Sequence, residues 1–369
     1  MAPTNPAEFL DHLTQALDGA APLALVPGID QATIPQGAAL VLGTSGSTAG
    51  QPQIVAVSRA SLHAAVSSTH QVLGGSGGWL LTLPADHVAG VMVAARSIVA
   101  GTPLTQATPG AFRTETFIAD VERLLHDGAD RHYTSLVPTQ LGRVLADPAA
   151  MRSAAQLDAI LVGGAATPSG MLRQARDAGL RVVTTYGMTE TCGGCVYDGI
   201  PLPGVEITLE PESGRVRITG PQVALGYLMD GELRPFNDSF TTADRGSWEG
   251  GRLRILGRLD DVIISGGVNV DPRIVEETIL GLESVAECLV VGLPDAEWGQ
   301  RVAAAVVPRP GLDEAQRREL PDRVAQIVRQ RLGGAWTPRL VLALDELPLR
   351  GPGKPDRAAV AGILARERD

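Results

Sequence analysis

The sequence is poor in aromatic residues, in cysteine and in excess positive charge. Phe, Trp and Tyr make up 4% of the chain, and there are 3 cysteines. So few cysteines exclude a scaffold held together by disulfides. The formal net charge of −10 argues against nucleic acid as the main partner, because binding to a phosphate backbone needs clustered Lys and Arg.

Long hydrophobic runs are also missing. The longest apolar stretches, such as residues 88–95 (VAGVMVAA), are far shorter than a helix that crosses a bilayer, so no membrane span is expected. The first residues show no basic segment followed by an apolar one, and we expect a cytoplasmic location. With 44% hydrophobic and 20% charged residues and a mean hydropathy of +0.09, the composition is typical of a soluble globular protein.

Two of the three cysteines, Cys192 and Cys195, form a C-x-x-C pair. This spacing occurs in zinc and redox sites, but the chain has no second pair at zinc spacing. The pair also encloses Gly193 and Gly194 and does not open a thioredoxin-like helix. We therefore expect neither metal nor redox chemistry there.

The 369 residues exceed the usual limit for one hydrophobic core, which predicts a large domain and a smaller one. Apolar runs that alternate with helical stretches between residues 38 and 190 indicate a layered α/β domain. Short strands with Gly and Pro turns follow at about 200–256 and indicate a β-rich subdomain. We place an N-terminal domain at 1–259 and a small α+β domain at 260–369. Expected strands are residues 39–43, 53–58, 79–83, 132–137, 159–164, 181–186, 204–209, 215–220, 252–257, 286–292 and 302–308.

A loop of small and hydroxyl-bearing residues follows the first expected strand of this domain. Residues 44–53 read TSGSTAGQPQ, and their backbone N–H groups and hydroxyls suit an anion such as phosphate. The loop lacks the Gly-Lys-Ser/Thr of a Walker motif. Taken alone, it is also compatible with a plain surface turn. The candidate phosphate ligands are Thr44, Ser45, Gly46, Ser47 and Thr48.

Three further segments accompany this loop in a fixed order: residues 186–191 (YGMTET), 257–272 (GRLDDVIISGGVNVDP) and 348–357 (PLRGPGKPDR). With the loop, they resemble the acyl-adenylate-forming superfamily, which includes acyl- and aryl-CoA synthetases and peptide-synthetase adenylation domains. The family's loop is typically TSGSTG-x-PK, so Ala49 is an insertion here and Gln53 stands in place of the lysine. The resemblance implies the fold of that superfamily, with a mobile C-terminal domain.

The resemblance also implies roles in the large domain. Tyr186 would lie beside the adenine, and Gly187 would permit a sharp turn. Thr189 would lie near the phosphates, and Glu190 would hold Mg²⁺. A carboxylate that holds Mg²⁺ suits phosphate chemistry, because the metal offsets charge on the attacked and leaving oxygens.

Further roles are implied for the second half of the chain. Asp244, in 242–246 (TADRG), would bind the ribose hydroxyls, and Arg258 would contact the ribose and phosphates. Asp260 would be the hinge about which the small domain rotates. Lys354 would stabilise the negative charge that builds up when a carboxylate attacks the α-phosphate. An isolated Asp, Arg or Lys is usually a solvated surface charge, so these roles depend on the complete set of motifs.

The chain is short for this superfamily. The short length resembles the compact actinobacterial form of o-succinylbenzoate–CoA ligase. Three segments add to this resemblance: residues 84–90 (PADHVAG), 134–145 (TSLVPTQLGRVL) and 161–166 (LVGGAA). Such a substrate carries a second carboxylate, which requires a cation or hydroxyl near the acyl pocket. Arg143 is the candidate cation, although it is equally compatible with a surface position. The other candidates are Ser135 and Thr139 as hydrogen-bond donors, Gly163, Gly164 and Ala165 as space for a flat ring, and His87 as a gate or a core histidine.

We therefore expect a ligase that uses ATP, Mg²⁺ and CoA to convert an aromatic carboxylate into its CoA thioester. A homodimer is a possible assembly. Two other functions remain open at this point. One is another aryl-CoA ligase or a stand-alone adenylation enzyme, and the other is a degenerate nucleotide-binding regulator, which Gln53 and Ala243 suggest.

Overall fold

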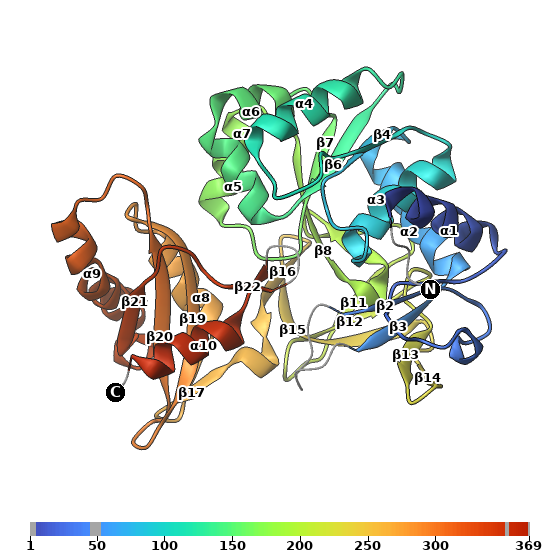
Figure 1. Cartoon of the computed structure of the whole chain (residues 1–369). Coiled ribbons are helices and arrows are strands. Elements are labelled where there is room, and N and C mark those ends of the chain that lie inside the picture. The colour runs from blue at the N-terminus through green and yellow to red at the C-terminus, as the bar shows by residue number, and fades with distance from the viewer. Residues whose placement is uncertain (1–4, 45–52, 351–353, 368–369) are drawn as a thin grey trace. The chain divides into compact units, whose positions relative to one another are not determined.

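The computed structural model describes residues 5–44, 53–350 and 354–367, with the side chains of Arg350 and Lys354 left out. The chain divides into two compact units (Figure 1). The large unit comprises Met1–Thr242 and Trp248–Arg254, and the small unit comprises Ala243–Ser247 and Ile255–Asp369. We expected a boundary at residue 260; the main division between the compact units falls at residues 254–255.

A seven-stranded sheet forms the centre of the large unit, in the order β10-β9-β8-β7-β6-β4-β5. The strands from β5 to β8 run parallel, and β9 and β10 are added antiparallel. Parallel strands are expected here, because helices connect them and cover both faces. The strands are β4 (Gly78–Leu81), β5 (Leu104–Gln106), β6 (His132–Leu136), β7 (Ala159–Val162), β8 (Val182–Met188), β9 (Gly193–Tyr197) and β10 (Ile200–Pro201).

Two further sheets follow, and all their residues belong to the large unit except 243–247 of β15 and 255–258 of β16, which belong to the small unit. One has the order β1-β2-β3-β13-β14, and the other has the order β11-β12-β15-β16 and corresponds to the expected β-rich subdomain. Their strands are β1 (Leu23–Ala24), β2 (Ala38–Gly43), β3 (Ile54–Ser58), β13 (Gly226–Met229), β14 (Glu232–Pro235), β11 (Glu206–Leu209), β12 (Arg215–Thr219), β15 (Ser239–Glu249) and β16 (Arg252–Arg258).

The helices of the large unit pack in two groups, one against the central sheet and one against the sheet that contains β2 and β3. One buried cluster packs α4, α5, α6 and α7 against β4, β6, β7 and β8, and Figure 1 shows these helices in teal and green in the upper part of the view. A second cluster packs α1, α2 and α3 against β2 and β3. The helices are α1 (Pro6–Asp18), α2 (Arg59–Leu73), α3 (Val88–Ala100), α4 (Thr114–Leu125), α5 (Pro138–Ala146), α6 (Pro148–Ala154) and α7 (Ser169–Asp177), with short 3-10 turns η1 (Gln31–Thr33) and η2 (Thr189–Thr191).

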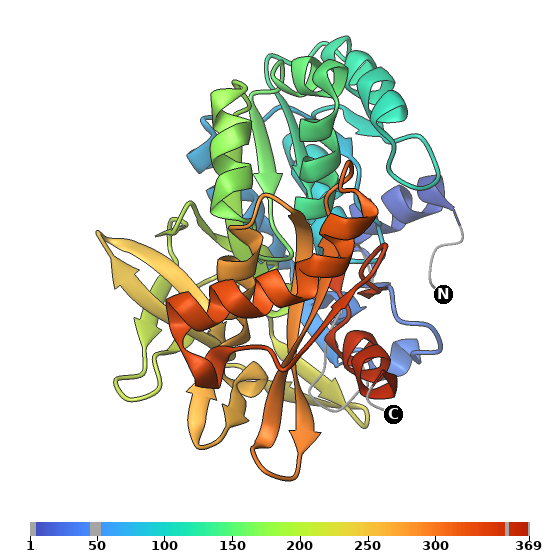
Figure 2. The same ribbon diagram turned by 90° about the vertical axis from the view of Figure 1, so that its left-hand side faces the viewer.

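The small unit has a five-stranded sheet in the order β18-β17-β20-β19, with β21 beside β20. Helices α8 and α9 pack on one buried cluster and α10 on another, so both faces of the sheet are covered (Figure 2). A hairpin of β22 and β23 precedes α10. The elements are η3 (Leu259–Asp261), β17 (Ile263–Ser265), β18 (Val268–Val270), α8 (Pro272–Leu280), β19 (Val285–Asp295), β20 (Gly299–Pro308), α9 (Glu314–Leu332), η4 (Gly334–Trp336), β21 (Leu340–Ala343), β22 (Leu349–Arg350), β23 (Lys354–Pro355) and α10 (Arg357–Arg366).

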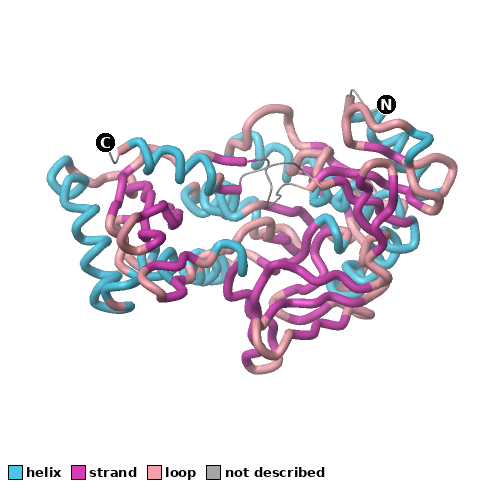
Figure 3. The backbone as a smooth tube through the Cα atoms, turned by 90° about the horizontal axis from the view of Figure 1, so that it is seen from below, coloured by secondary structure: helices cyan, strands magenta, loops and turns pink. Residues whose placement is uncertain are grey.

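The expected α/β class, with a β-rich subdomain and a smaller α+β unit, is confirmed, and Figure 3 shows both units mixing helices and strands. Two helix starts follow from residue type: Ser58 caps α2 by accepting from the Ser61 N–H at 2.9 Å, and Pro138 begins α5. No helix in the described part of the chain combines the length and apolar character needed to cross a bilayer.

Candidate active site

One edge of the central sheet gathers most of the candidate residues of the large unit. The strands β4, β6, β7 and β8 are parallel, so their carboxyl ends point to the same edge. Open α/β sheets bind ligands at that edge. The candidates that lie at the ends of these strands, or in the segments that follow them, are His87, Ser135, Thr139, Gly163, Gly164, Ala165, Tyr186, Gly187, Thr189 and Glu190.

The phosphate loop leaves β2 and returns into β3. The Thr44 N–H donates to the Gln53 carbonyl at 2.8 Å, and the Gln53 N–H donates to the Thr44 hydroxyl at 3.1 Å. These two bonds close the neck of the loop. Ser45, Gly46, Ser47 and Thr48 lie outside the described residues, so their part in phosphate binding stays a prediction.

Glu190 lies in η2, directly after β8. Its side chain is buried, and its Oε1 accepts a hydrogen bond from the Tyr227 hydroxyl at 2.7 Å. Tyr227 belongs to β13 and pairs with Val55 of β3, two residues after the neck of the phosphate loop. The structure thus brings the candidate metal carboxylate close to the strand that leaves the phosphate loop. Sequence reasoning missed Tyr227, because only the pairing of β13 with β3 brings it to Glu190.

Gly187 does not form the sharp turn that we expected. It lies inside β8, which continues to Met188 and pairs there with β9 after an irregularity in register between Tyr186 and Gly187. A Cβ atom at Gly187 would lie 1.9 Å from the Gly193 carbonyl oxygen. Glycine is therefore required by the close approach of two backbones and not by a turn.

The candidate residues for the acyl pocket differ in burial and in the groups that they contact. Ser135 is buried, and its carbonyl accepts from the Thr82 hydroxyl at 2.5 Å. A Cβ at Gly163 would lie 2.2 Å from Thr185 Oγ1, so the space beside Gly163 is filled by this side chain. His87 is the N-cap residue of α3 and makes no capping bond through its side chain. Its Nε2 is 3.8 Å from Asp86 Oδ1.

Arg143, the candidate cation, is exposed in the last turn of α5. Its Nη1 donates to the Phe112 carbonyl at 3.0 Å. The guanidinium is thus engaged with backbone at the protein surface. Its role toward a substrate carboxylate stays a prediction.

A buried cation that sequence reasoning missed lies on α3. Arg96 is 4% exposed, its Nη2 donates to the Tyr197 hydroxyl at 3.4 Å, and its Cζ lies 4.9 Å from the centre of the Trp79 ring. Burial lowers the pKa of Arg96, and burial and the Arg96 charge lower the pKa of His70 from 6.5 to about 4. The signal in the sequence was one arginine inside the apolar run of residues 88–100.

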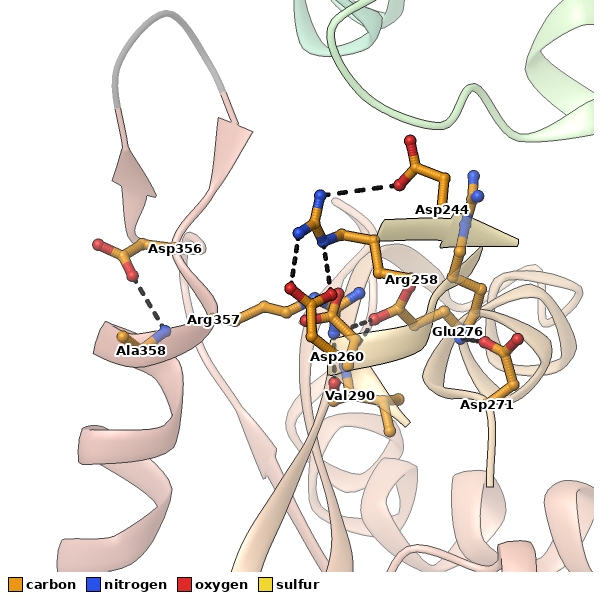
Figure 4. A network of polar contacts seen from close by, with 11 residues as sticks. Asp244, Arg258, Asp260, Asp271, Glu276, Val290, Asp356, Arg357 and Ala358 are labelled. Carbon is orange, nitrogen blue, oxygen red and sulfur yellow. Dashed lines mark hydrogen bonds and ion pairs between the residues drawn. The ribbon is translucent and has the colours of Figure 1, made fainter. Parts of the chain in front are cut away.

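In the small unit, Asp244, Arg258 and Asp260 form one cluster (Figure 4). Arg258 donates from Nε to Asp260 Oδ1 at 2.8 Å and from Nη2 to Asp260 Oδ2 at 2.6 Å, and its Nη1 lies 3.7 Å from Asp244 Oδ1. The hydrogen bonds that Arg258 donates to Asp260 raise the pKa of Arg258. The structure therefore joins the two candidate ribose ligands and the expected hinge residue.

The carboxylates of the described residues limit how magnesium could be held. Among the residues that the structure describes, no group of three or more His, Cys, Asp or Glu gathers at one place. Mg²⁺ is usually held by one or two carboxylates together with substrate phosphates and water, so the single Glu190 carboxylate fits such a site. Cys192 and Cys195 are buried, and burial raises the pKa of both thiols, which disfavours the reactive thiolate form.

Comparison with known proteins gives consistent results for the two halves of the chain. Residues 8–228 match the AMP-binding enzyme family, and residues 274–354 match the AMP-binding enzyme C-terminal domain. A probable 2-succinylbenzoate–CoA ligase from Mycobacterium tuberculosis is 41% identical over 337 residues, which cover 90% of this chain and 86% of the relative. The 2-succinylbenzoate–CoA ligase of Escherichia coli is 35% identical over 239 residues, covering 62% of this chain and 49% of the relative.

Solved structures show the same similarity. A variant of Escherichia coli MenE with bound OSB-AMS is 27% identical with a TM-score of 0.73, and the match covers 93% of this chain and 72% of that one. The amide bond synthetase McbA from Marinactinospora thermotolerans is 26% identical with a TM-score of 0.75, covering 89% and 70%. The chain therefore belongs to the family of AMP-binding, adenylate-forming enzymes.

Proposed function

We propose that the protein activates o-succinylbenzoate with ATP and transfers the acyl group to CoA, as an AMP-forming acid–thiol ligase. The observation that carries this proposal is the 41% identity to a probable 2-succinylbenzoate–CoA ligase, which extends over most of both chains. A match of this extent covers both halves of the fold and not merely the nucleotide-binding elements. The reaction belongs to menaquinone biosynthesis.

The reaction has two steps. A carboxylate oxygen of the acid attacks the α-phosphorus of ATP, and the bond to the bridging oxygen breaks to release pyrophosphate. The CoA thiol then loses its proton to solvent and attacks the acyl carbon, and the acyl–oxygen bond breaks so that AMP leaves with the bonding electron pair. Both steps build negative charge on oxygen, so an enzyme accelerates them by placing positive groups where that charge develops.

In the large unit, we assign nucleotide binding to the phosphate loop and to the end of β8. The loop residues 44–48 hold the phosphates, Tyr186 and Gly187 line the adenine side, and Thr189 contacts phosphate. Glu190 is the ligand for Mg²⁺, which supplies charge neutralisation at the phosphates when bound. The support is the bond between Tyr227 and Glu190, which fixes one carboxylate oxygen next to the strand that follows the loop.

In the small unit, we assign Asp244 and Arg258 to the ribose, Asp260 to the hinge and Lys354 to catalysis. The support is the cluster of Asp244, Arg258 and Asp260 within a single compact unit. An ammonium group at Lys354 stabilises the charge that develops as the carboxylate attacks. Rotation about Asp260 would then place the small unit for the second step.

We assign recognition of the acid to the edge of the central sheet. Ser135 and Thr139 would donate hydrogen bonds, Gly163, Gly164 and Ala165 would line the ring, and His87 would gate entry at the start of α3. Arg143 remains the candidate partner of the second carboxylate, because a charged ligand group needs a charge-assisted partner once it leaves water. Arg143 is exposed, so its guanidinium can reach such a group from the surface end of α5.

The direct test is detection of the product. Purified protein, o-succinylbenzoate, ATP, Mg²⁺ and CoA are incubated, and o-succinylbenzoyl-CoA and AMP are measured by mass spectrometry. We expect both products in equal amounts, with none when ATP is omitted. Protein that binds ATP but forms no AMP with any acid would instead indicate a nucleotide-binding regulator.

A second assay separates this reaction from that of other family members, since one structural neighbour is an amide bond synthetase. Pyrophosphate release is measured with a panel of aromatic and aliphatic acids, with and without CoA. We expect o-succinylbenzoate to give the highest kcat/KM. A Lys354→Ala variant should lose adenylate formation far more than thioester formation from supplied acyl-adenylate, and equal losses would contradict the role of this lysine.

A further inference from the structure

Arg357 lies three residues after Lys354, at the point where the β22–β23 hairpin joins α10. Its guanidinium reaches three other elements of the small unit (Figure 4). Nε lies 3.3 Å from Asp261 Oδ2 in η3, and Nη1 lies 2.9 Å from Glu276 Oε1 in α8. Nη1 also donates to the carbonyl of Val290 in β19. One side chain therefore joins the start of α10 to three segments that are far apart in the sequence.

The partners of Arg357 are themselves fixed. Glu276 Oε1 also accepts from the Val290 N–H at 2.9 Å, and the Glu276 side chain is only 14% exposed. Asp261 directly follows Asp260, the expected hinge residue, in the 3-10 turn η3. Arg357 thus binds one carboxylate in the body of the small unit and another where the chain leaves the hinge.

The base of the hairpin is closed beside this cluster. Asp356 caps α10 by accepting from the N–H groups of Ala358 and Ala359, both at 3.0 Å. Its own N–H donates to the Pro348 carbonyl at 2.8 Å, and Arg350 pairs with Lys354 across the two strands. Any movement of Arg357 relative to η3 or α8 is therefore transmitted over two peptide units to β23, whose first residue is Lys354.

We propose that Arg357 is a positioning residue for adenylate formation: by binding Asp261 and Glu276 at once, it fixes the base of the lysine hairpin to the segment that leaves the hinge. Lys354 and the hinge segment then turn as one rigid body. The proposal rests on the proposed function, in which Lys354 acts in the first step. A planar guanidinium suits this role, because it donates in several directions at fixed angles, whereas an ammonium on a flexible stem does not.

The test compares Arg357→Lys with Arg366→Lys, which changes an exposed arginine at the other end of α10. Arg357→Lys keeps the positive charge near Glu276 but cannot span both carboxylates. Adenylation is followed by pyrophosphate release, and the second step by thioester formation from supplied o-succinylbenzoyl-adenylate and CoA. We expect kcat of adenylation to fall about 10- to 100-fold, since a displacement of about 1 Å costs on the order of 100-fold. The second step should change less than about threefold, and Arg366→Lys should leave both steps unchanged.

A second readout does not depend on activity. Amide hydrogen exchange of Leu349, Arg350 and Lys354 is measured in the full chain, with the strands β19 and β20 as an internal reference. Arg357→Lys and Asp261→Asn should both speed exchange in β22 and β23 while β19 and β20 keep their protection. Unchanged exchange in the hairpin, or equal loss of both half-reactions with loss of protection throughout the small unit, would overturn the proposal.

The two proposals can fail separately. Wild-type protein that forms no o-succinylbenzoyl-adenylate would count against the proposed function, and the exchange measurement would then decide on the Arg357 anchor by itself. Normal adenylation by Arg357→Lys, with altered exchange, would count against the positioning role while leaving the proposed function intact.

Discussion

Two arginines, the buried Arg96 and the partly buried Arg357, show that the two units surround a positive charge with different partners. Arg357 in the small unit contacts two carboxylates, Asp261 and Glu276. Arg96 in the large unit takes part in none of the ion pairs among the described residues and lies instead against the Tyr197 hydroxyl and the Trp79 ring. Both positions exclude much of the solvent, but only Arg357 is neutralised by opposite charge.

This difference predicts different responses to substitution. Removing one partner of a buried ion pair leaves an uncompensated charge, which costs far more than the pair itself contributes. Removing a buried charge that has neutral partners leaves no such charge behind. Replacing Arg357 should therefore lower the stability of the small unit, whereas the large unit should tolerate replacement of Arg96.

The largest effect is expected for Arg357→Met. The change leaves Glu276 and Asp261 without this cation, and we expect a loss of about 2–3 kcal/mol in the free energy of unfolding of the small unit, less than for a fully buried pair because Arg357 and Asp261 are partly exposed. Denaturant unfolding, monitored by amide hydrogen exchange in β19 and β20, measures this loss of stability. The double variant Arg357→Met/Glu276→Gln should recover part of the loss, and no recovery would show that packing and not charge is responsible.

A smaller effect is expected for Tyr227→Phe, which tests a carboxylate with a neutral partner. The change removes the donor to Glu190 Oε1. A hydrogen bond to a charged group is worth about 1.5–3 kcal/mol, so Mn²⁺, used as a probe in the presence of ATP, should bind about tenfold more weakly by electron paramagnetic resonance. Tyr133→Phe is the matched control, because its hydroxyl donates to the carbonyls of Leu73 and Gly75. Equal weakening in both variants would show a general loss of stability.

The two units should also respond oppositely to pH. The pKa of His70 falls from 6.5 to about 4 on folding, so the unfolded chain binds more protons in that window and the large unit loses stability as pH falls through it. Burial raises the pKa of Glu276 and Asp261 above their usual 4.5 and 3.8. The folded small unit then binds more protons, and its stability falls as pH rises from about 4.

Hydrogen exchange corrected for intrinsic rates, at pH 4.5 and 7, resolves the two units. We expect the free energy of unfolding of the large unit to fall by about 1 kcal/mol between pH 7 and 4.5. This value is smaller than the pKa shift alone would give, because His70 is partly exposed. His70→Gln should remove the acid sensitivity of α2 and α3, and Glu276→Gln should reduce the response of α8. The same dependence of stability on pH in both units would contradict this comparison.

The smallest effect is expected for Arg96→Met. The Tyr197 hydroxyl keeps its partner Thr69 Oγ1 at 3.1 Å, and no carboxylate is left alone. Methionine fills a similar volume, so the free energy of unfolding should change by less than about 1.5 kcal/mol. A loss of 3 kcal/mol or more would show that Arg96 has a charged partner that the structure does not reveal.

Much of the fold followed from the sequence, because local patterns carry it. Alternating apolar runs placed β2, β6 and β7 to within two residues at either end, and Ser58 and Pro138 marked helix starts through their own backbone chemistry. Gly187 was misread, since a glycine in a sequence does not reveal whether a turn or a neighbouring backbone requires it. The neighbour here is Gly193, which reaches Gly187 through the antiparallel pairing of β8 with β9.

The candidate site was predictable in its residue types and less so in its contacts. The cluster of Asp244, Arg258 and Asp260 joins residues that the motifs had singled out separately. Tyr227 and Arg96 were missed, because each meets its partner through the pairing or packing of distant elements. The sequence allowed a surface position for Arg143, and the residue is exposed, but the direction of its guanidinium depends on the carbonyl of Phe112, which no local sequence pattern predicts.

By itself, the sequence determined the α/β class, the family and the order of the chemistry-bearing segments, because these depend on residue type and spacing. Only the tertiary structure decided which charges are neutralised and which are left with neutral partners. The energy of a buried charge depends on the groups within a few ångströms of it. For Arg357, Arg96 and Glu190, important contacts come from other elements of the chain.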